Sequence, residues 1–245
     1  MTTATFQFHA DLEELLPKNK RDAIIQVKIN GHETVKHLIE ALGVPHTEVD
    51  VVLVNGVSVT FEYRLKGGDQ VQVYPPGAKV DVVPVIHLRS EGKGEMRFVL
   101  DGHLGRLAAY LRLMGFDALY RNDYDDEELA SISYTEDRLL LTRDRGLLKR
   151  AVVNRGYWVR EIEPQKQLVE MFDRFNLASQ ARPFTRCAKC NGLLKPVKKE
   201  EVCDQLEPKT KAYYHDFRKC EQCDQVYWKG SHFRKLEKLI HGLLQ

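Results

Sequence analysis

The 245-residue sequence predicts a small α+β domain, then an α/β domain with a parallel sheet, and then a short metal-binding tail. Three observations predict this order. Alternating apolar stretches and a hairpin signal fill the first 80 residues, strand and helix patterns alternate across residues 97–180, and two Cys-x-x-Cys pairs follow. We therefore expect domains at residues 1–80, 97–180 and 181–245, with residues 81–96 as a connector.

The first domain combines strand patterns with one short helix. The stretches TFQFHADL and AIIQVKIN have strand periodicity, and HETVKHLIEALGVP has helical periodicity with Thr34 as the N-cap. Asn55-Gly56 stands between two β-branched runs and predicts a hairpin, and VQVY predicts a last strand. These elements together make a small α+β domain.

Four strand patterns, each followed by a helical pattern, make up the second domain. The strand patterns are RFVL, FDALY, RLLLT and GYWVREI. The first helix should end at Gly115, and the last should begin near Pro164. Because strands that alternate with helices usually pair in parallel, we expect a three-layer sandwich. A C-terminal helix is expected in HFRKLEKLIHGLL.

Acidic residues stand where these strands end and their helices begin. Asp101 follows RFVL and Asp144 follows LLLTR. As a third acid we choose Asp126, where the helix DEELASIS begins after the second strand. Because the carboxyl ends of parallel strands meet at one edge of a sheet, we expect these carboxylates to converge. Clustered carboxylates hold Mg²⁺ or Mn²⁺, which polarises a phosphate and activates water, so the pattern points to a metal-dependent enzyme that acts on nucleic acid.

Each of these acids also has a structural alternative, because an acid at a helix start can cap the helix or complement its dipole. Further candidates for the third acid are Asp123, Asp125, Glu127 and Glu128. Glu161, after the last strand, is either a fourth ligand or a surface charge. Arg143 and Arg145 flank Asp144 and would either neutralise a substrate phosphate or pair with the acids.

Four of the five cysteines form two Cys-x-x-Cys pairs. Cys187, Cys190, Cys220 and Cys223 have the spacing of a tetrahedral zinc ribbon. Four thiolates fill the coordination shell, so this zinc would stabilise the fold and would not catalyse. Cys203 has no partner at that spacing, and we expect a packed or surface thiol. Metal-type cysteine spacing favours a reducing compartment, so we expect a cytoplasmic protein.

Charge differs between the ends of the chain. Residues 1–96 carry 10 basic and 13 acidic side chains, and residues 186–245 carry 13 basic and 8 acidic ones. A locally basic tail suits a polyanion, although a solvated surface explains it nearly as well. No apolar run is long enough to span a membrane, and no secretory signal peptide, G-x-G-x-x-G or Walker A motif occurs.

The first domain resembles the ubiquitin-like β-grasp family of sulfur-carrier proteins through TVKHLIEALGVP, VLVNGVSV and GGDQVQVYPP. Those carriers end in a free Gly-Gly that is used for activation. Here Gly67-Gly68 precedes the last strand, and the chain continues through PPGAKVDVVPV. We therefore expect a binding or packing role for this domain and no sulfur transfer.

Residues 97 to about 238 resemble the Mut7-C RNase domain family, which belongs to the PIN-like nuclease superfamily and carries a zinc ribbon. The matching segments are FVLDGHLGRLAAYLRLMGFDALY, DDEELA, LLLTRD, RCAKCNGLL and CEQCDQVYWKGSHF. The resemblance implies an α/β PIN-like fold and metal-dependent RNase activity. It implies that Asp101, Asp126 and Asp144 bind catalytic Mg²⁺ or Mn²⁺, and that Cys187, Cys190, Cys220 and Cys223 bind structural Zn²⁺.

The sequence thus favours a ribonuclease that hydrolyses RNA phosphodiester bonds through a carboxylate cluster. The alternative is a non-catalytic RNA-binding or adaptor protein, in which the zinc ribbon grips RNA and the β-grasp domain recruits a protein partner. The acids distinguish the two hypotheses. They bind divalent metal in the enzyme, and they serve only as helix caps bound to backbone N–H groups in the adaptor.

Overall fold

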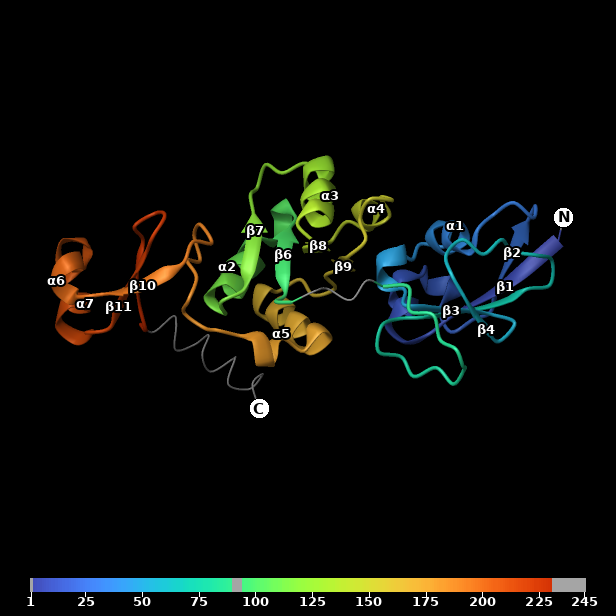
Figure 1. The fold of residues 1–245 in the computed structure, drawn as a ribbon, viewed down its shortest axis with the longest axis horizontal. Coiled ribbons are helices and arrows are strands. Elements are labelled where there is room, and N and C mark those ends of the chain that lie inside the picture. Colours follow the sequence, from blue (N-terminus) through green and yellow to red (C-terminus); the bar gives the residue numbers. More distant parts are fainter. Residues whose placement is uncertain (1, 90–93, 231–245) are drawn as a thin grey trace. The chain divides into compact units, whose positions relative to one another are not determined.

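The computed structural model describes residues 2–89 and 94–230 (Figure 1). The chain forms two compact units, and each contains two stretches of sequence. The first unit holds residues 1–93 and 125–158, and the second holds residues 94–124 and 159–245. The first unit therefore joins residues 125–158 to the N-terminal domain, and the domain boundaries expected from the sequence stay a prediction. The helix expected in HFRKLEKLIHGLL lies outside the described residues.

The N-terminal domain is a five-stranded sheet in the order β2-β1-β5-β3-β4. β1 pairs antiparallel with β2 and parallel with β5, and β3 and β4 form the hairpin predicted at Asn55-Gly56. The elements are β1 (Thr2–Phe8), β2 (Ile25–Ile29), α1 (Val35–Ala41), β3 (Val51–Val54), β4 (Val57–Val59) and β5 (Gln70–Tyr74). Thr34 caps α1, as predicted, by accepting the backbone N–H of His37. This is the β-grasp arrangement that the resemblance implies.

Apolar side chains from β1, α1 and the neighbouring strands form one core in this domain. Phe6 and Ile39 have no exposed surface, and Leu12, from the 3-10 helix Ala10–Leu15, is equally buried. Burying a side chain of this size contributes about 1.5–3 kcal/mol. Trp158, from the far end of the first unit's sequence, also packs against this core.

The α/β part has its strands and helices in the predicted order. Its four strands form a sheet in the order β7-β6-β8-β9, in which β6 pairs parallel with β7 and β8 pairs parallel with β9. The strands are β6 (Arg97–Leu100), β7 (Asp117–Tyr120), β8 (Leu139–Thr142) and β9 (Gly156–Trp158). The helices are α2 (Gly105–Leu113), α3 (Asp126–Thr135), α4 (Arg145–Leu148) and α5 (Pro164–Phe175). The prediction of a parallel α/β sheet is therefore confirmed.

Two predicted helix ends of the α/β part have a clear physical basis. Gly115 follows α2 with a φ of 92°, and a Cβ at this position would lie 2.1 Å from the carbonyl oxygen of Arg182. Pro164 is the first residue of α5, where its missing N–H costs no intrahelical bond. The two helices that these residues delimit, α2 and α5, pack against each other in the second unit.

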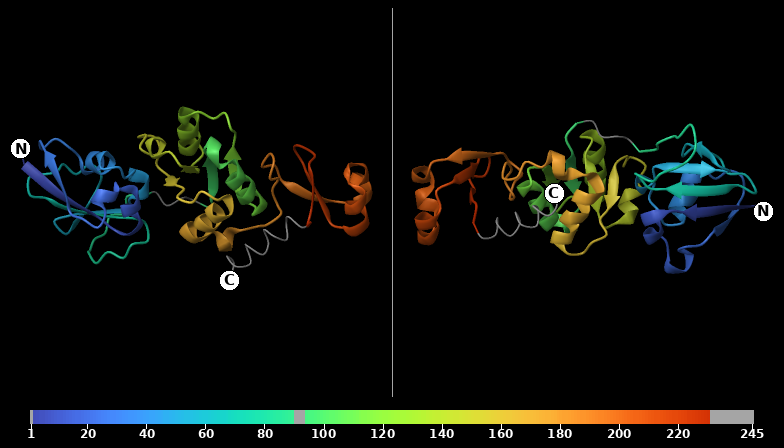
Figure 2. Two further views of the ribbon diagram at one scale, coloured as in Figure 1. Left: turned by 180° about the vertical axis from the view of Figure 1, so that it is seen from behind. Right: turned by 90° about the horizontal axis from the view of Figure 1, so that it is seen from below.

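Residues 181–230, here called the ribbon, contain an antiparallel sheet in the order β10-β11-β12 with two short helices beside it (Figure 2). The elements are β10 (Leu194–Val197), α6 (Lys199–Val202), α7 (Pro208–Tyr213), β11 (Phe217–Cys220) and β12 (Val226–Trp228). The sequence analysis predicted neither α6 nor α7. Across the described ranges, no helix is both long and apolar enough to cross a bilayer.

Candidate metal centre and acidic junctions

The two Cys-x-x-Cys pairs come together in the ribbon. The Sγ atoms of Cys187, Cys190, Cys220 and Cys223 all lie within 4.8 Å of one another. Cys187 Sγ is 3.6 Å from Cys223 Sγ, and Cys190 Sγ is 3.4 Å from Cys220 Sγ. Four sulfurs at about 2.3 Å from a central zinc would be about 3.8 Å apart, so this set is close to the size of a tetrahedral site. The predicted ligand set could therefore hold a metal ion.

Tight turns after each cysteine pair aim the sulfurs inward. Asn191 and Asp224 directly follow the two pairs, and both have left-handed backbone conformations, with φ values of 71° and 59°. The backbone at position 192 passes close to Cys220 Sγ, and glycine fits there because a Cβ would lie 3.0 Å from that sulfur. Backbone N–H groups point at the sulfurs, since Cys190 N is 3.5 Å from Cys187 Sγ. Such turns suit thiolates that accept N–H hydrogen bonds.

Tyr227, on β12, contacts the centre from outside the ligand set. Its hydroxyl lies 3.1 Å from Cys187 Sγ. Burial opposes ionisation of Cys187, but hydrogen bonds from Tyr227 and from the amides of Cys190 and Lys189 outweigh it and lower the pKa of this thiol to about 7. Burial raises the pKa of Cys190 to about 12. Without a metal, the thiol of Cys187 would therefore ionise at a lower pH than that of Cys190.

Arg112, on α2, ties the first cysteine pair to the α/β part. This side chain is 5% exposed, and its Nε donates to the carbonyl oxygen of Ala118 at 2.8 Å. Its Nη1 donates to the carbonyl oxygens of Ala188 and Lys189, each at 3.1 Å. Burial lowers the pKa of Arg112, and the nearby thiols of Cys187 and Cys190 act in the opposite direction. The positively charged guanidinium of Arg112 is thus held beside the thiols, where it offsets their negative charge.

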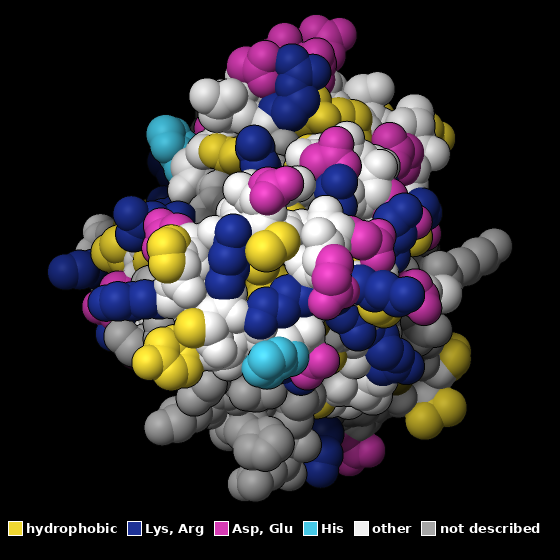
Figure 3. Space-filling model, turned by 90° about the vertical axis from the view of Figure 1, so that its left-hand side faces the viewer, with side chains coloured by type: hydrophobic (Ala, Val, Ile, Leu, Met, Phe, Trp, Pro, Cys, Tyr) yellow, Lys and Arg dark blue, Asp and Glu magenta, His cyan; other side chains and the backbone are white. Residues whose placement is uncertain are grey.

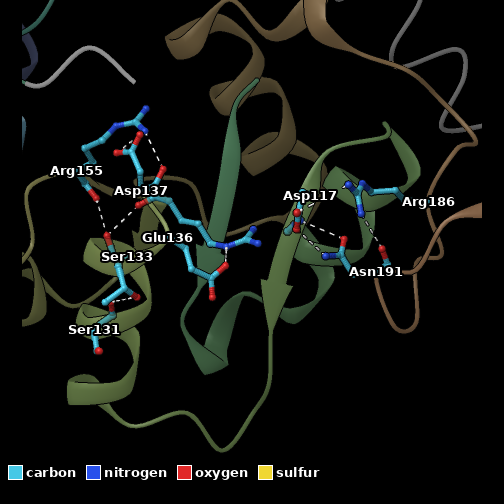
Figure 4. A network of polar contacts seen from close by, with 11 residues as sticks. Asp117, Ser131, Ser133, Glu136, Asp137, Arg155, Arg186 and Asn191 are labelled. Carbon is cyan, nitrogen blue, oxygen red and sulfur yellow. Dashed lines mark hydrogen bonds and ion pairs between the residues drawn. The ribbon is translucent and has the colours of Figure 1, made fainter. Parts of the chain in front are cut away.

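Asn191 and Asp117 make a second connection between the ribbon and β7 (Figure 4). Asn191 Nδ2 donates to Asp117 Oδ1 at 2.7 Å, and Asn191 Oδ1 accepts the N–H of Ala118 at 3.2 Å. Arg186 completes the group, with its Nη2 3.8 Å from Asp117 Oδ2. Sequence reasoning missed Tyr227, Arg112 and Asn191, because all three act on residues at no regular spacing from themselves.

The three predicted catalytic acids stand at strand–helix junctions, as expected. Asp101 directly follows β6 and precedes the 3-10 helix Gly102–Leu104, which its side chain does not cap. Asp126 is the first residue of α3, and its Oδ2 lies 3.7 Å from Arg150 Nη2. Asp144 is the N-cap of α4. Asp101 belongs to the second unit and the other two to the first, and the convergence of all three stays a prediction.

Several acids at these junctions have structural partners. Asp125 caps α3 in a capping box, in which its Oδ1 accepts the N–H of Glu128 at 2.8 Å and Glu128 Oε2 accepts the N–H of Asp125 at 3.1 Å. Asp144 Oδ1 accepts the N–H of Gly146 at 2.6 Å. Asp123 pairs with Arg121 at 2.6 Å, and this contact lowers the pKa of Asp123. Asp126 is therefore not needed as the cap of α3.

Comparison with known proteins identifies both parts of the chain. The model of the Mut7-C RNAse domain matches residues 96–240, and the model of the Mut7-C ubiquitin domain matches residues 1–81. Two crystal structures of small archaeal modifier protein 1 from Haloferax volcanii match at 21% and 22% identity, with TM-scores of 0.26 and 0.25. Each match covers 31% of this chain, and they cover 99% and 98% of the modifier chains.

A search of curated proteins found no match to this sequence. The RNAse domain model, in contrast, spans more than half of the chain and includes both the strand–helix junctions and all four clustered cysteines. The ubiquitin model precedes it in the order that the sequence analysis expected. The chain therefore belongs to the Mut7-C RNAse domain family.

Proposed function

We propose that this protein is a cytoplasmic ribonuclease that hydrolyses RNA phosphodiester bonds with Mg²⁺ or Mn²⁺ bound by Asp101, Asp126 and Asp144. The observation that carries the proposal is the match of the RNAse domain model to residues 96–240, which include all three acids. The bound cation would polarise the scissile phosphate and lower the pKa of an attacking water. The fold class to which we assign the nuclease domain is PIN-like.

The surroundings of the acids support these roles. Asp125 already caps α3, so the carboxylate of Asp126 is not needed for the cap hydrogen bond of this helix. Asp144 uses Oδ1 for its cap, and Oδ2 is not part of that hydrogen bond. Asp101 does not cap the 3-10 helix that follows it. Carboxylate oxygens are the ligands that Mg²⁺ and Mn²⁺ prefer.

The ribbon is the part of the chain that we propose contacts RNA, with the four cysteines holding structural Zn²⁺. Residues 181–230 contain eleven Lys and Arg and seven Asp and Glu. On the face drawn in Figure 3, Lys and Arg side chains are interspersed with acidic ones. The Lys and Arg side chains could each contact a phosphate, and binding through them should weaken with salt. The β-grasp domain is available for a protein partner.

The test is cleavage of an RNA panel by the parent and by Asp101→Asn, with Mg²⁺ or Mn²⁺ and with EDTA. The substitution keeps the size of the side chain and removes its charge. We expect cleavage and metal affinity to fall together, while thermal stability and RNA binding largely remain. Asp123→Asn is the matched control, because Asp123 is exposed and paired with Arg121. It should cleave like the parent.

The adaptor hypothesis has one structural observation in its favour, which is that Asp144 and Asp125 serve as helix caps. In an adaptor, Asp144→Asn would change only helix stability, by about 1 kcal/mol or less. Cleavage by Asp101→Asn at the rate of the parent, under matched metal concentrations, would refute the carboxylate mechanism. An absence of cleavage by the parent across the whole panel would favour the adaptor.

A further inference from the structure

Within the first unit, the N-terminal domain makes buried and partly buried polar contacts with the segment that carries Asp144. Lys149, just after α4, extends its Nζ to the carbonyl oxygen of Glu40 at 2.6 Å. His46 Nε2 lies 2.9 Å from the carbonyl oxygen of Val153, and its Nδ1 lies 2.7 Å from Glu40 Oε1. These contacts join the end of α1 to the loop between α4 and β9. The N-terminal domain is therefore packed onto this loop and is not merely tethered to it.

The 3-10 helix His46–Glu48 lies against β9 at close range. Glu48 has no exposed surface, and its Oε1 accepts the backbone N–H of Trp158 at 2.6 Å. Gly156 permits this approach, because a Cβ there would lie 2.5 Å from Leu148 Cδ2 and 3.5 Å from Thr47 Cβ. A buried carboxylate that loses its partner is strongly destabilising. The buried carboxylate of Glu48 thus binds the backbone of β9 directly.

Trp158 connects this contact to both neighbours of Asp144. Its Nε1 donates to the carbonyl oxygen of Arg143 at 3.1 Å. The guanidinium of Arg145 lies 5.3 Å from the centre of the Trp158 ring, and Arg145 Nη1 donates to the carbonyl oxygen of Leu15 at 2.6 Å. The backbone on one side of Asp144 and the side chain on the other are therefore held by Trp158 and the N-terminal domain.

From these contacts we propose that Trp158 is a positioning residue for Asp144, and that the N-terminal domain supports it through Glu48 and Leu15. The proposal rests on the proposed function, since it takes Asp144 as a ligand of the catalytic cation. Mutation of a group that orients a metal ligand commonly lowers metal affinity by about 10–100-fold. The β-grasp domain is then a working part of the nuclease, which agrees with Gly67-Gly68 being internal.

The chain contains two tryptophans, and this makes a matched test available. Trp158→Phe keeps an aromatic ring but removes the indole N–H that donates to the carbonyl oxygen of Arg143. Trp228→Phe makes the same change in the ribbon. In the zinc-loaded full chain, we expect Trp158→Phe to speed exchange of the Gly146 amide, which Asp144 caps, by about tenfold or more. Affinity for Mn²⁺, titrated alone, should fall by about tenfold or more. Trp228→Phe should match the parent in both measurements.

A second pair of variants tests the support from the N-terminal domain. Glu48→Gln keeps an acceptor oxygen for the N–H of Trp158 and should behave like the parent. Glu48→Leu removes the acceptor and should behave like Trp158→Phe. Parent-like exchange at Gly146 in Trp158→Phe would overturn the positioning role, and it would do so whether or not the protein cleaves RNA. A parent that neither binds Mn²⁺ nor cleaves RNA, with faster Gly146 exchange in Trp158→Phe, would refute the proposed function and leave the positioning of Asp144 supported.

Discussion

The N-terminal domain and the ribbon hold their folds in different ways. In the N-terminal domain, 18 buried apolar residues form one core. In the described part of the ribbon, two small clusters hold four and three buried residues, and two of these are cysteines. A core as small as the ribbon's rarely stabilises a fold without a disulfide or a metal. From this comparison we expect the N-terminal domain to depend on apolar burial and the ribbon to depend on a metal bound by its four cysteines.

The largest expected effect is loss of the metal from the ribbon. Cys220→Ser, or a strong chelator, should abolish metal binding and remove amide protection in β10–β12, because structural zinc supplies on the order of 10–16 kcal/mol to small domains of this kind. Metal analysis and residue-resolved hydrogen exchange measure both effects. The N-terminal domain should keep its protection. Cys203→Ser, which changes the cysteine outside the cluster, is the control and should keep its metal. A ribbon that stays protected without metal would break the comparison.

The second effect tests the opposite end of the chain. Phe6→Ala should lower the free energy of unfolding of the N-terminal domain by about 3–5 kcal/mol, because it empties a fully buried site. Urea titration measures this loss. Val57→Ala, at a position 64% exposed on β4, should change stability little. The metal content of the ribbon should stay at the parent level in both variants, and its loss in Phe6→Ala would mean that the two ends do not fold independently.

Tyr227→Phe should weaken the metal centre without abolishing it. Tyr227 donates to Cys187 and helps lower the pKa of that thiol to about 7, so its removal should raise this pKa. Protons then compete better for the sulfur, and zinc should be released at a higher pH than in the parent. Affinity should fall by about tenfold or more. Zinc release followed from pH 8 to pH 4 measures the shift, and Tyr213→Phe, at an exposed position, should not move it.

The smallest effect separates two adjacent acids. Asp125→Ala should lower stability by about 1 kcal/mol, because it removes the capping box of α3. Asp126→Ala should change stability less, since its contact with Arg150 is a half-exposed ion pair. Thermal unfolding measures the difference. If Asp126 binds the catalytic cation, only its variant should lose metal-dependent cleavage. If Asp125→Ala loses metal-dependent cleavage and Asp126→Ala keeps it, Asp125 is the ligand of the cation.

Local patterns account for most of what could be predicted. The Asn55-Gly56 hairpin, the Thr34 cap, Gly115 after α2 and Pro164 at the start of α5 all depend on residues within a few positions of one another. The sequence analysis did not find α6 or α7, because each is too short to show a helical period. It also could not decide between Asp125 and Asp126, since only the backbone geometry at α3 shows which one caps the helix.

The sequence by itself determined the order of the strands and helices, the acids at their junctions and the four cysteines that come together, because spacing and periodicity are local properties. Only the tertiary structure decided which residues support these groups. Glu48 and Trp158 are 110 positions apart, Arg145 and Leu15 are 130 apart, and Arg112 reaches carbonyl groups 76 and 77 positions away. Backbone carbonyl groups are present at every residue, so no pattern of side chains indicates which of them a distant donor will find.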